Sequence, residues 1–105
     1  MATSNQLIGV LSGHIGKGNG ISVKRLALKL QTTERNVRAL VSEAREMDHA
    51  ICGTPRDGYY MAATPDELEQ TCKFLRDRAM HSLHLESRLR KIPLSDLIGQ
   101  LHVPT

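Results

Sequence analysis

The sequence predicts a mostly α-helical protein with one small β-hairpin and a long helix toward the C-terminus. Three observations lead to this prediction. Apolar residues recur at helical spacing in two stretches of the first half of the chain. Two short apolar segments then flank a turn that contains Asp57-Gly58. From Pro65 to Ile92 no glycine and no further proline interrupts the chain, so one uninterrupted helix is expected there.

The first segment, residues 5–12, is expected to form a short amphipathic helix. Residues 13–20 contain four glycines, which end that helix. This run is not a nucleotide-binding phosphate loop, because Gly16-Lys17 is followed by glycine instead of Ser or Thr and no apolar strand precedes it. The sequence therefore predicts a flexible connector over residues 13–20.

Two further helices are predicted, at residues 23–30 and 33–47, joined by a short turn. The second has an apolar stripe at positions i, i+3, i+4 and i+7 that begins at Val37. Thr33 is placed to accept an amide hydrogen as the N-cap of this helix. Residues 21–22, just before the first of the two helices, are expected to form a short strand.

A β-hairpin is predicted next, with apolar segments at residues 50–52 and 59–62. Its tip, residues 53–58, is polar and contains Pro55 and the turn-favouring Asp57-Gly58.

The long helix has a clear start signal. Thr64 is expected as its N-cap, Pro65 as its first residue and Glu67 as the partner in a capping box. A helix of roughly 27 residues is about 40 Å long, more than the width of a small domain. Part of it is therefore expected to extend beyond the domain.

Apolar residues on this helix alternate four and three apart, which is the spacing of a coiled-coil seam. This pattern favours a homodimer formed through the helix, and the alternative is a single helix folded back across its own domain. The expected interface residues are Leu68, Cys72, Leu75, Ala79, Leu83 and Leu89.

The chain is expected to divide into a domain over residues 1–63, the long helix over residues 64–92 and a tail over residues 93–105. The tail is apolar for a chain end. It is expected to dock on the dimer partner or to bind another protein as a helix in a groove.

Composition limits the possible functions. The 105 residues suffice for one modest core, and the net charge of +3 is unevenly placed. Residues 1–56 carry eight Lys/Arg and four Asp/Glu, whereas residues 57–105 carry six and seven. An anionic partner such as nucleic acid is therefore favoured for the N-terminal half.

Several other classes of protein are disfavoured. There is no leader-like or membrane-spanning apolar run, so a cytoplasmic protein without a membrane partner is expected. Cys52 and Cys72 are expected to be reduced and buried. His49 with Cys52, and His81 with His84, have metal-like spacing without the remaining ligands of a zinc site. No arrangement of catalytic residues stands out, so we expect no enzyme activity, metal or cofactor.

The segment from Val23 to Val41, together with the hairpin, resembles a winged helix-turn-helix DNA-binding domain of the biotin-repressor-like and DeoR-like kind. Ala27 stands where a small residue lets two helices cross closely, and residues 30–40 look like the family's turn and recognition helix. Residues 58–61 resemble the return strand of the wing. Two positions depart from the pattern, because Gln31 replaces the usual glycine of the turn and Thr32 an aliphatic residue. The resemblance implies either a left-handed backbone at Gln31, at a cost of about 1 kcal/mol, or a wider turn.

The resemblance also implies that the helix at residues 33–47 enters the major groove of double-stranded DNA. The wing, residues 53–58, would then lie on the flanking groove. Arginine can read guanine or bind phosphate, and asparagine can pair with adenine. The candidate DNA-binding residues are Thr33, Arg35, Asn36, Arg38, Ser42, Arg56, Lys24 and Arg25.

A domain of this kind without an effector module is similar to small winged-helix proteins of phages and plasmids. The expected role is a transcription regulator or a replication-origin accessory. The alternative is a protein–protein adaptor whose basic helix and long helix bind an acidic partner.

Overall fold

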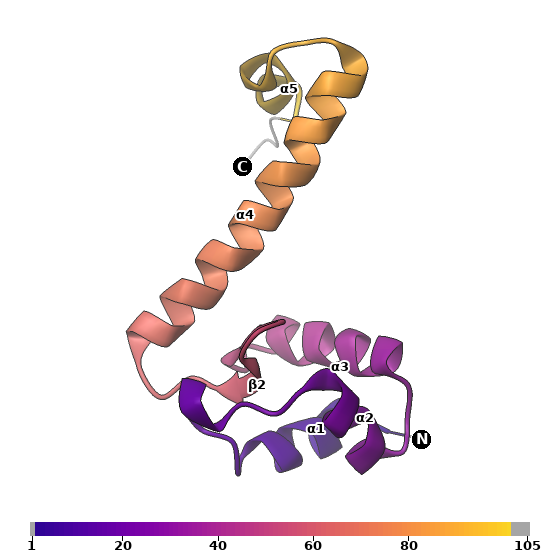
Figure 1. Ribbon diagram of the computed structural model, residues 1–105, viewed down its shortest axis with the longest axis vertical. Coiled ribbons are helices and arrows are strands. Elements are labelled where there is room, and N and C mark those ends of the chain that lie inside the picture. Colours follow the sequence, from indigo (N-terminus) through magenta and orange to yellow (C-terminus); the bar gives the residue numbers. More distant parts are fainter. Residues whose placement is uncertain (1, 102–105) are drawn as a thin grey trace. The chain divides into compact units, whose positions relative to one another are not determined.

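The structure, a computed structural model, describes residues 2–101 (Figure 1). The chain forms two compact units, an N-terminal unit (Met1–Thr71) and a C-terminal unit (Cys72–Thr105). Three helices are followed by a two-stranded antiparallel hairpin, a long helix and a short last helix. This order confirms the predicted fold class, which is mostly α with a small hairpin and a long C-terminal helix.

The first helix, α1, spans Ser4–Leu11 and begins with a capping box that the sequence analysis did not identify. The hydroxyl of Thr3 accepts a 3.2 Å hydrogen bond from the amide of Gln6, and the Gln6 side chain accepts one of 3.0 Å from the amide of Thr3. Leu7 and Leu11 are completely buried, so the apolar side of α1 faces the core.

The next two helices are α2 (Val23–Leu30) and α3 (Glu34–Glu46), and α3 packs against both α1 and α2. Serine and threonine hydroxyls cap the two helices. Ser22 accepts a 3.2 Å bond from the amide of Arg25, and Thr33 accepts one of 3.1 Å from the amide of Asn36, as predicted for Thr33. The core cluster includes Leu7, Leu11, Ile21, Leu26, Ala27, Val37, Leu40, Val41, Ala44 and Ile51.

The turn between α2 and α3 contains a left-handed residue. Gln31 has φ 54° and ψ 49°. The amide of Thr32 donates to the carbonyl of Ala27 over 3.0 Å, and the amide of Gln31 donates to that of Leu28 over 3.3 Å. This is a Schellman cap, so Gln31 adopts the left-handed backbone without being glycine.

The hairpin consists of β1 (Ile51–Thr54) and β2 (Gly58–Met61), with Ile51 paired to Met61 and Thr54 to Gly58. The predicted tip at residues 53–58 was therefore too long. The ladder takes up residues 53, 54 and 58, so the tip, called the wing tip below, is residues 55–57.

The predicted strand at residues 21–22 is a single bridge. The amide of Ile21 donates to the carbonyl of Tyr59 over 2.9 Å, and the reverse bond measures 2.8 Å. This bridge extends the hairpin on the outer edge of β2.

Residues 13–20 are tied to the same edge of β2, contrary to the prediction of a flexible connector. The amide of Met61 donates to the carbonyl of His14 over 2.8 Å, and the amide of Gly16 donates to the carbonyl of Met61 over 2.9 Å. A short 3-10 helix, η1 (Lys17–Asn19), follows. The difference arises because backbone pairing with a distant strand leaves no local sequence signal.

The long helix α4 spans Pro65–Arg90, and the hydroxyl of Thr64 accepts a 3.2 Å bond from the amide of Glu67, as expected of its N-cap. The boundary between the two units lies inside α4, between Thr71 and Cys72, whereas the sequence placed it at Thr64. None of the helices in residues 2–101 is both long enough and apolar enough to span a bilayer.

The short helix α5 (Leu94–Gln100) turns back beside the last turns of α4 (Figure 1). Within this unit Leu97 and Ser87 are buried, while Ile98 and Leu101 stay exposed. The remainder of the predicted tail, residues 102–105, lies outside the described residues.

The two cysteines differ in environment. Both are free thiols; Cys52 is buried as expected, but the prediction that Cys72 is buried was wrong. Cys72 lies on α4 one residue after the buried Thr71, so its side chain points away from the packed side of the helix.

Candidate nucleic-acid interface

The apolar stripe of α3 shows which side of the helix faces the core. Val37, Leu40, Val41 and Ala44 are all buried. Because successive residues rotate by 100° around a helix, positions 35, 39, 42 and 46 lie on the opposite side, and all four are exposed. The first half of this outward side carries Arg35 and the second half carries Glu46, so the side is basic only near its N-terminus.

The predicted reading residues on this side are available for contacts. Arg35 and Ser42 have exposed side chains and make no hydrogen bond or ion pair with any residue in the described range 2–101. Arg38 pairs with Glu34 over 3.9 Å, with both side chains at least half exposed. An exposed helical pair of this kind contributes about 0.3–0.5 kcal/mol, so Arg38 can exchange it for another anion at little cost.

Thr33 and Asn36 lie at the N-terminal end of α3 and not in the middle of its exposed side. The hydroxyl of Thr33 is occupied by helix capping. The side-chain amide of Asn36 donates a 2.9 Å bond to the hydroxyl of Thr32, and Asn36 is half-buried. The hydroxyl of Thr32 therefore holds the side chain of Asn36 in place.

The helix α2 presents two predicted cations. Lys24 and Arg25 are exposed, and within residues 2–101 neither side chain has a hydrogen bond or ion pair. Leu28, which lies between Arg25 and Lys29 in the sequence, is the most exposed large apolar residue of the N-terminal unit, at 71%.

The wing tip is a closed turn that carries Arg56. The hydroxyl of Thr54 donates to Asp57 Oδ2 and accepts from the amide of Asp57, both over 3.1 Å. Gly58 has φ 73°, and a side chain there would overlap the backbone of Ile21. Arg56 is exposed at this fixed tip and was predicted correctly to lie there.

One cation beside the wing tip was not among the predicted site residues. The ammonium of Lys17 lies 3.9 Å from Asp57 Oδ2 and 3.4 Å from Gln70 Oε1. The amide of Lys17 donates a 2.9 Å bond to the carboxylate of Glu67. Sequence spacing could not reveal this cluster, because about forty to fifty residues separate its members along the chain.

Backbone amides surround the Glu67 carboxylate. Hydrogen bonds from the amides of Lys17 and Ala63 hold the pKa of Glu67 below its ordinary value. Glu67 thus binds residues 16–19 to the start of α4. The Glu67 position was predicted for a capping box, and its contact with Lys17 is the additional finding.

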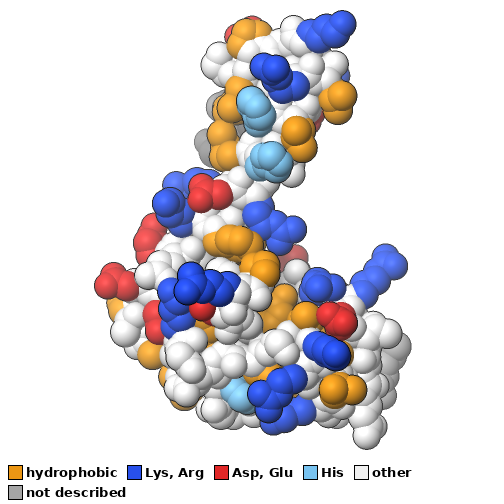
Figure 2. Space-filling view, viewed as in Figure 1, with side chains coloured by type: hydrophobic (Ala, Val, Ile, Leu, Met, Phe, Trp, Pro, Cys, Tyr) orange, Lys and Arg blue, Asp and Glu red, His pale blue; other side chains and the backbone are white. Residues whose placement is uncertain are grey.

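Charge is distributed differently between the two units than between the two halves of the sequence. The N-terminal unit has eight Lys/Arg and eight Asp/Glu, and the C-terminal unit has six and three. Figure 2 shows Lys and Arg side chains protruding from both units. Any attraction of the N-terminal unit to DNA therefore depends on local segregation of cations from acids, not on its net charge.

The predicted seam of α4 is mostly exposed in this chain. Leu68, Leu75 and Leu89 are 41%, 42% and 84% exposed, whereas Leu83 is half-buried. Cys72 and Ala79 are also exposed. The start of α4 contacts the hairpin through Thr71 instead, whose hydroxyl accepts a 3.3 Å bond from the amide of Gly53.

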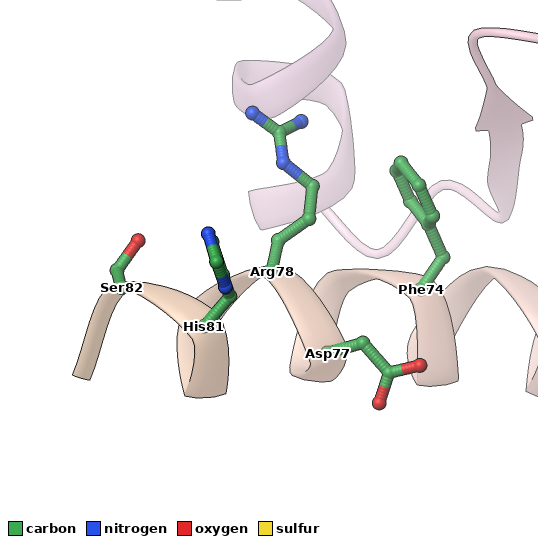
Figure 3. A pocket seen from close by; sticks show the side chains of 5 residues that line it. All are labelled: Phe74, Asp77, Arg78, His81 and Ser82. Carbon is green, nitrogen blue, oxygen red and sulfur yellow. The ribbon is translucent and has the colours of Figure 1, made fainter. Parts of the chain in front are cut away.

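A second face of α4 carries a shallow pocket (Figure 3). Phe74, Arg78, His81 and Ser82 project from the same side of the helix, while Asp77 points away. The Arg78 guanidinium lies 5.8 Å from the centre of the Phe74 ring, within cation–π range. In residues 2–101 no group of three His, Cys, Asp or Glu side chains is arranged to hold a metal ion.

Comparisons of this chain with protein-family models, with curated proteins and with solved structures found no match.

Proposed function

We propose that this protein binds double-stranded DNA, with α3 in the major groove and the wing, residues 53–58, on the flanking groove. The observation that carries the proposal is the outward side of the first half of α3. There Arg35 is exposed and without a partner among residues 2–101, and Arg38 has only a weak exposed ion pair. The order of three helices and a hairpin supports a winged helix-turn-helix assignment.

The contacts divide the candidate residues by role in this proposal. Arg35, Arg38 and Ser42 are the groups that read base edges or bind phosphate from α3. Thr33 and Asn36 hold the N-terminal end of the helix, because the Thr33 hydroxyl is already bonded and the amide of Asn36 has a partner on Thr32.

Lys24, Arg25 and Arg56 complete the proposed surface as phosphate contacts from α2 and the wing tip. All three are exposed. Phosphate contacts of this kind supply register and sequence-independent affinity, while the groove contacts of α3 supply specificity.

We further propose that the protein acts as a homodimer through α4. Leu68 and Leu75 lie seven residues apart, Leu89 follows fourteen residues later, and all three are exposed. A two-fold dimer would present two copies of α3 to the two halves of a palindromic site.

The proposed role is that of a transcription regulator or a replication-origin accessory in the cytoplasm, where both free thiols stay reduced. The exposed Ile98 and Leu101 of the last helix give the tail an apolar surface for a protein partner.

The test of DNA binding is a gel-shift or anisotropy titration of the full chain against a random duplex pool at low salt. The double variant Arg35→Ala with Arg38→Ala is expected to lower affinity at least tenfold, since both groove contacts are lost. Arg76→Ala with Arg88→Ala removes the same charge from exposed positions on α4 and is the matched control, expected to change affinity much less.

Absence of wild-type binding across the pool at low salt would refute the proposal and leave the adaptor hypothesis. Equal losses in the two double variants would show that only the overall charge matters and would refute the role of α3. Circular dichroism of each variant checks that the fold is retained.

A further inference from the structure

The loop of residues 16–19 is held in one conformation by hydrogen bonds to neighbouring residues and to α4. The side chain of Asn19 donates a 2.7 Å bond to the carbonyl of Ile15, and the His14 ring bonds the carbonyl of Asn19 over 2.8 Å. The Glu67 carboxylate binds the amide of Lys17. The backbone of Lys17 is therefore held in place while its side chain extends beside the wing tip.

The loop and the wing tip are in direct contact. A side chain at Gly20, the residue directly after the loop, would overlap the carbonyl oxygen of Asp57, so the end of the loop lies against the backbone of the wing tip. The Lys17 ammonium, about half exposed, lies 3.9 Å from the Asp57 carboxylate, and Asp57 directly follows Arg56. The Asp57 carboxylate is therefore close to one cation from the loop, and the residue before it in the wing tip is a second, exposed cation.

We infer that residues 16–19 form a second phosphate-contacting element beside the wing tip, with Lys17 as its cation and Asp57 as the group that holds Lys17 in the free protein. This inference rests on the proposed DNA binding. A DNA phosphate replaces Asp57 as the partner of Lys17, and the loop and the wing tip then contact the same stretch of backbone.

The contacts that a DNA phosphate would replace at Lys17 are weak. The Lys17–Asp57 distance of 3.9 Å is at the long limit of an ion pair, and the Gln70 bond of 3.4 Å is also long. Asp57 keeps a partner when Lys17 leaves, because the Thr54 hydroxyl still donates to it.

The test compares two substitutions that break the same ion pair from opposite sides. Salt-dependent titrations of duplex DNA are carried out with full-length wild type, Lys17→Met, Asp57→Asn and Lys73→Met. Lys73 is exposed on α4 and without an ion pair among residues 2–101, so it is the matched loss of one lysine.

Lys17→Met is expected to weaken binding and to make the slope of log K against log salt shallower by about 0.9, the value of one phosphate contact. Asp57→Asn is expected to strengthen binding, because it frees Lys17 and removes a negative charge from the wing tip. Lys73→Met is expected to leave the slope unchanged.

Two results would overturn the inference. One is a wild-type slope in Lys17→Met, and the other is weaker binding in both Lys17→Met and Asp57→Asn, as expected if the pair only stabilises the fold. Either result would refute the loop contact. If the double variant Arg35→Ala with Arg38→Ala still lost binding, the proposed DNA binding through α3 would stand. If wild type itself fails to bind DNA, the proposed function fails.

Discussion

Three helices in the described part of the chain end at residues whose backbone is left-handed although none of them is glycine. Gln31 has φ 54°, Asp48 φ 68° and Lys91 φ 56°. At each of them the following amide bonds a carbonyl five residues back, which closes a Schellman cap, as Ile92 does with Ser87 over 3.1 Å. The cost of this backbone is offset because the otherwise unpaired carbonyls at each helix end are satisfied.

Gln31→Gly is expected to raise the free energy of unfolding by about 0.5–1 kcal/mol. Glycine relieves the left-handed strain, and its greater freedom in the unfolded chain cancels part of the gain. Urea unfolding monitored by circular dichroism measures the change.

The control is Ala39→Gly, at an exposed position inside α3, where glycine should cost about 1 kcal/mol. Equal effects at the two positions would contradict the assignment of strain to Gln31.

At the scale of elements, Glu67 joins the loop of residues 16–19 to the start of α4. Its carboxylate accepts bonds of 2.9 Å from the amide of Lys17 and 2.8 Å from that of Ala63, and these bonds lower its pKa. A pKa lowered by folding means that the ionised form stabilises the folded state. That stabilisation is present above the ordinary glutamate pKa and is lost as the pH falls through the lower pKa of the folded protein.

Glu67→Gln is therefore expected to lower the melting temperature at neutral pH and to reduce the loss of stability on acidification. Gln can accept only one of the two amide bonds, because its second terminal atom is a donor. Thermal melts of wild type and variant between neutral and acidic pH provide the measurement.

Glu69→Gln removes the same charge from the first turns of α4 at an exposed position with no hydrogen bond or ion pair in the described part of the chain. A pH profile in which the two variants lose stability alike would count against the specific role of Glu67 and favour a general effect of charge near the helix start.

Both faces of the hairpin carry buried or partly buried side chains, and α4 is attached to the hairpin near its start. Tyr59 and Met61 pack against the core of the three helices, while Tyr60 and Cys52 are buried outside that cluster. Burial raises the pKa of Tyr60. Next to it in the hairpin, the amide of Gly53 donates a 3.3 Å bond to the hydroxyl of Thr71. Thr71 thereby attaches α4 to the hairpin without using the seam leucines.

At the scale of the whole molecule, the two units differ in net charge. The N-terminal unit is neutral in sum, with eight residues of each sign, and the C-terminal unit carries the excess of +3. Within the described residues of the C-terminal unit the one ion pair is Arg90 with Glu86, at 2.7 Å. The proposed dimer through α4 would bury exposed leucines of the unit that carries this positive charge, such as Leu75 and Leu89.

If the proposed dimer forms, light scattering on the full chain at micromolar concentration gives twice the monomer mass, and Leu75→Glu shifts the mass to that of the monomer. Leu75 lies at the centre of the exposed seam, and a buried carboxylate opposite its own copy is strongly unfavourable.

The matched control is Leu28→Glu, an exposed leucine on α2 away from the seam, which should leave the mass unchanged. A wild-type monomer over the full concentration range, or an unchanged mass in Leu75→Glu, would rule out the seam.

Local patterns in the sequence were sufficient to predict the helices, the hairpin and the outward side of α3. Caps such as Thr33 and Thr64, the apolar stripe from Val37 and the turn at Asp57-Gly58 act between residues three or four apart, and such local signals can be read from spacing. The same locality made Arg35 and Arg56 identifiable as exposed cations.

Contacts between groups that are far apart in the chain became visible in the folded structure and could not be predicted from spacing. The pairing of residues 14–16 with β2, the contact of Lys17 with Asp57 and Glu67, and the attachment of α4 through Thr71 join segments that are far apart in the chain. The exposure of Cys72 follows from the same attachment, since Thr71 takes the packed side of the helix. Non-local contacts depend on how the whole chain closes, which no local spacing encodes.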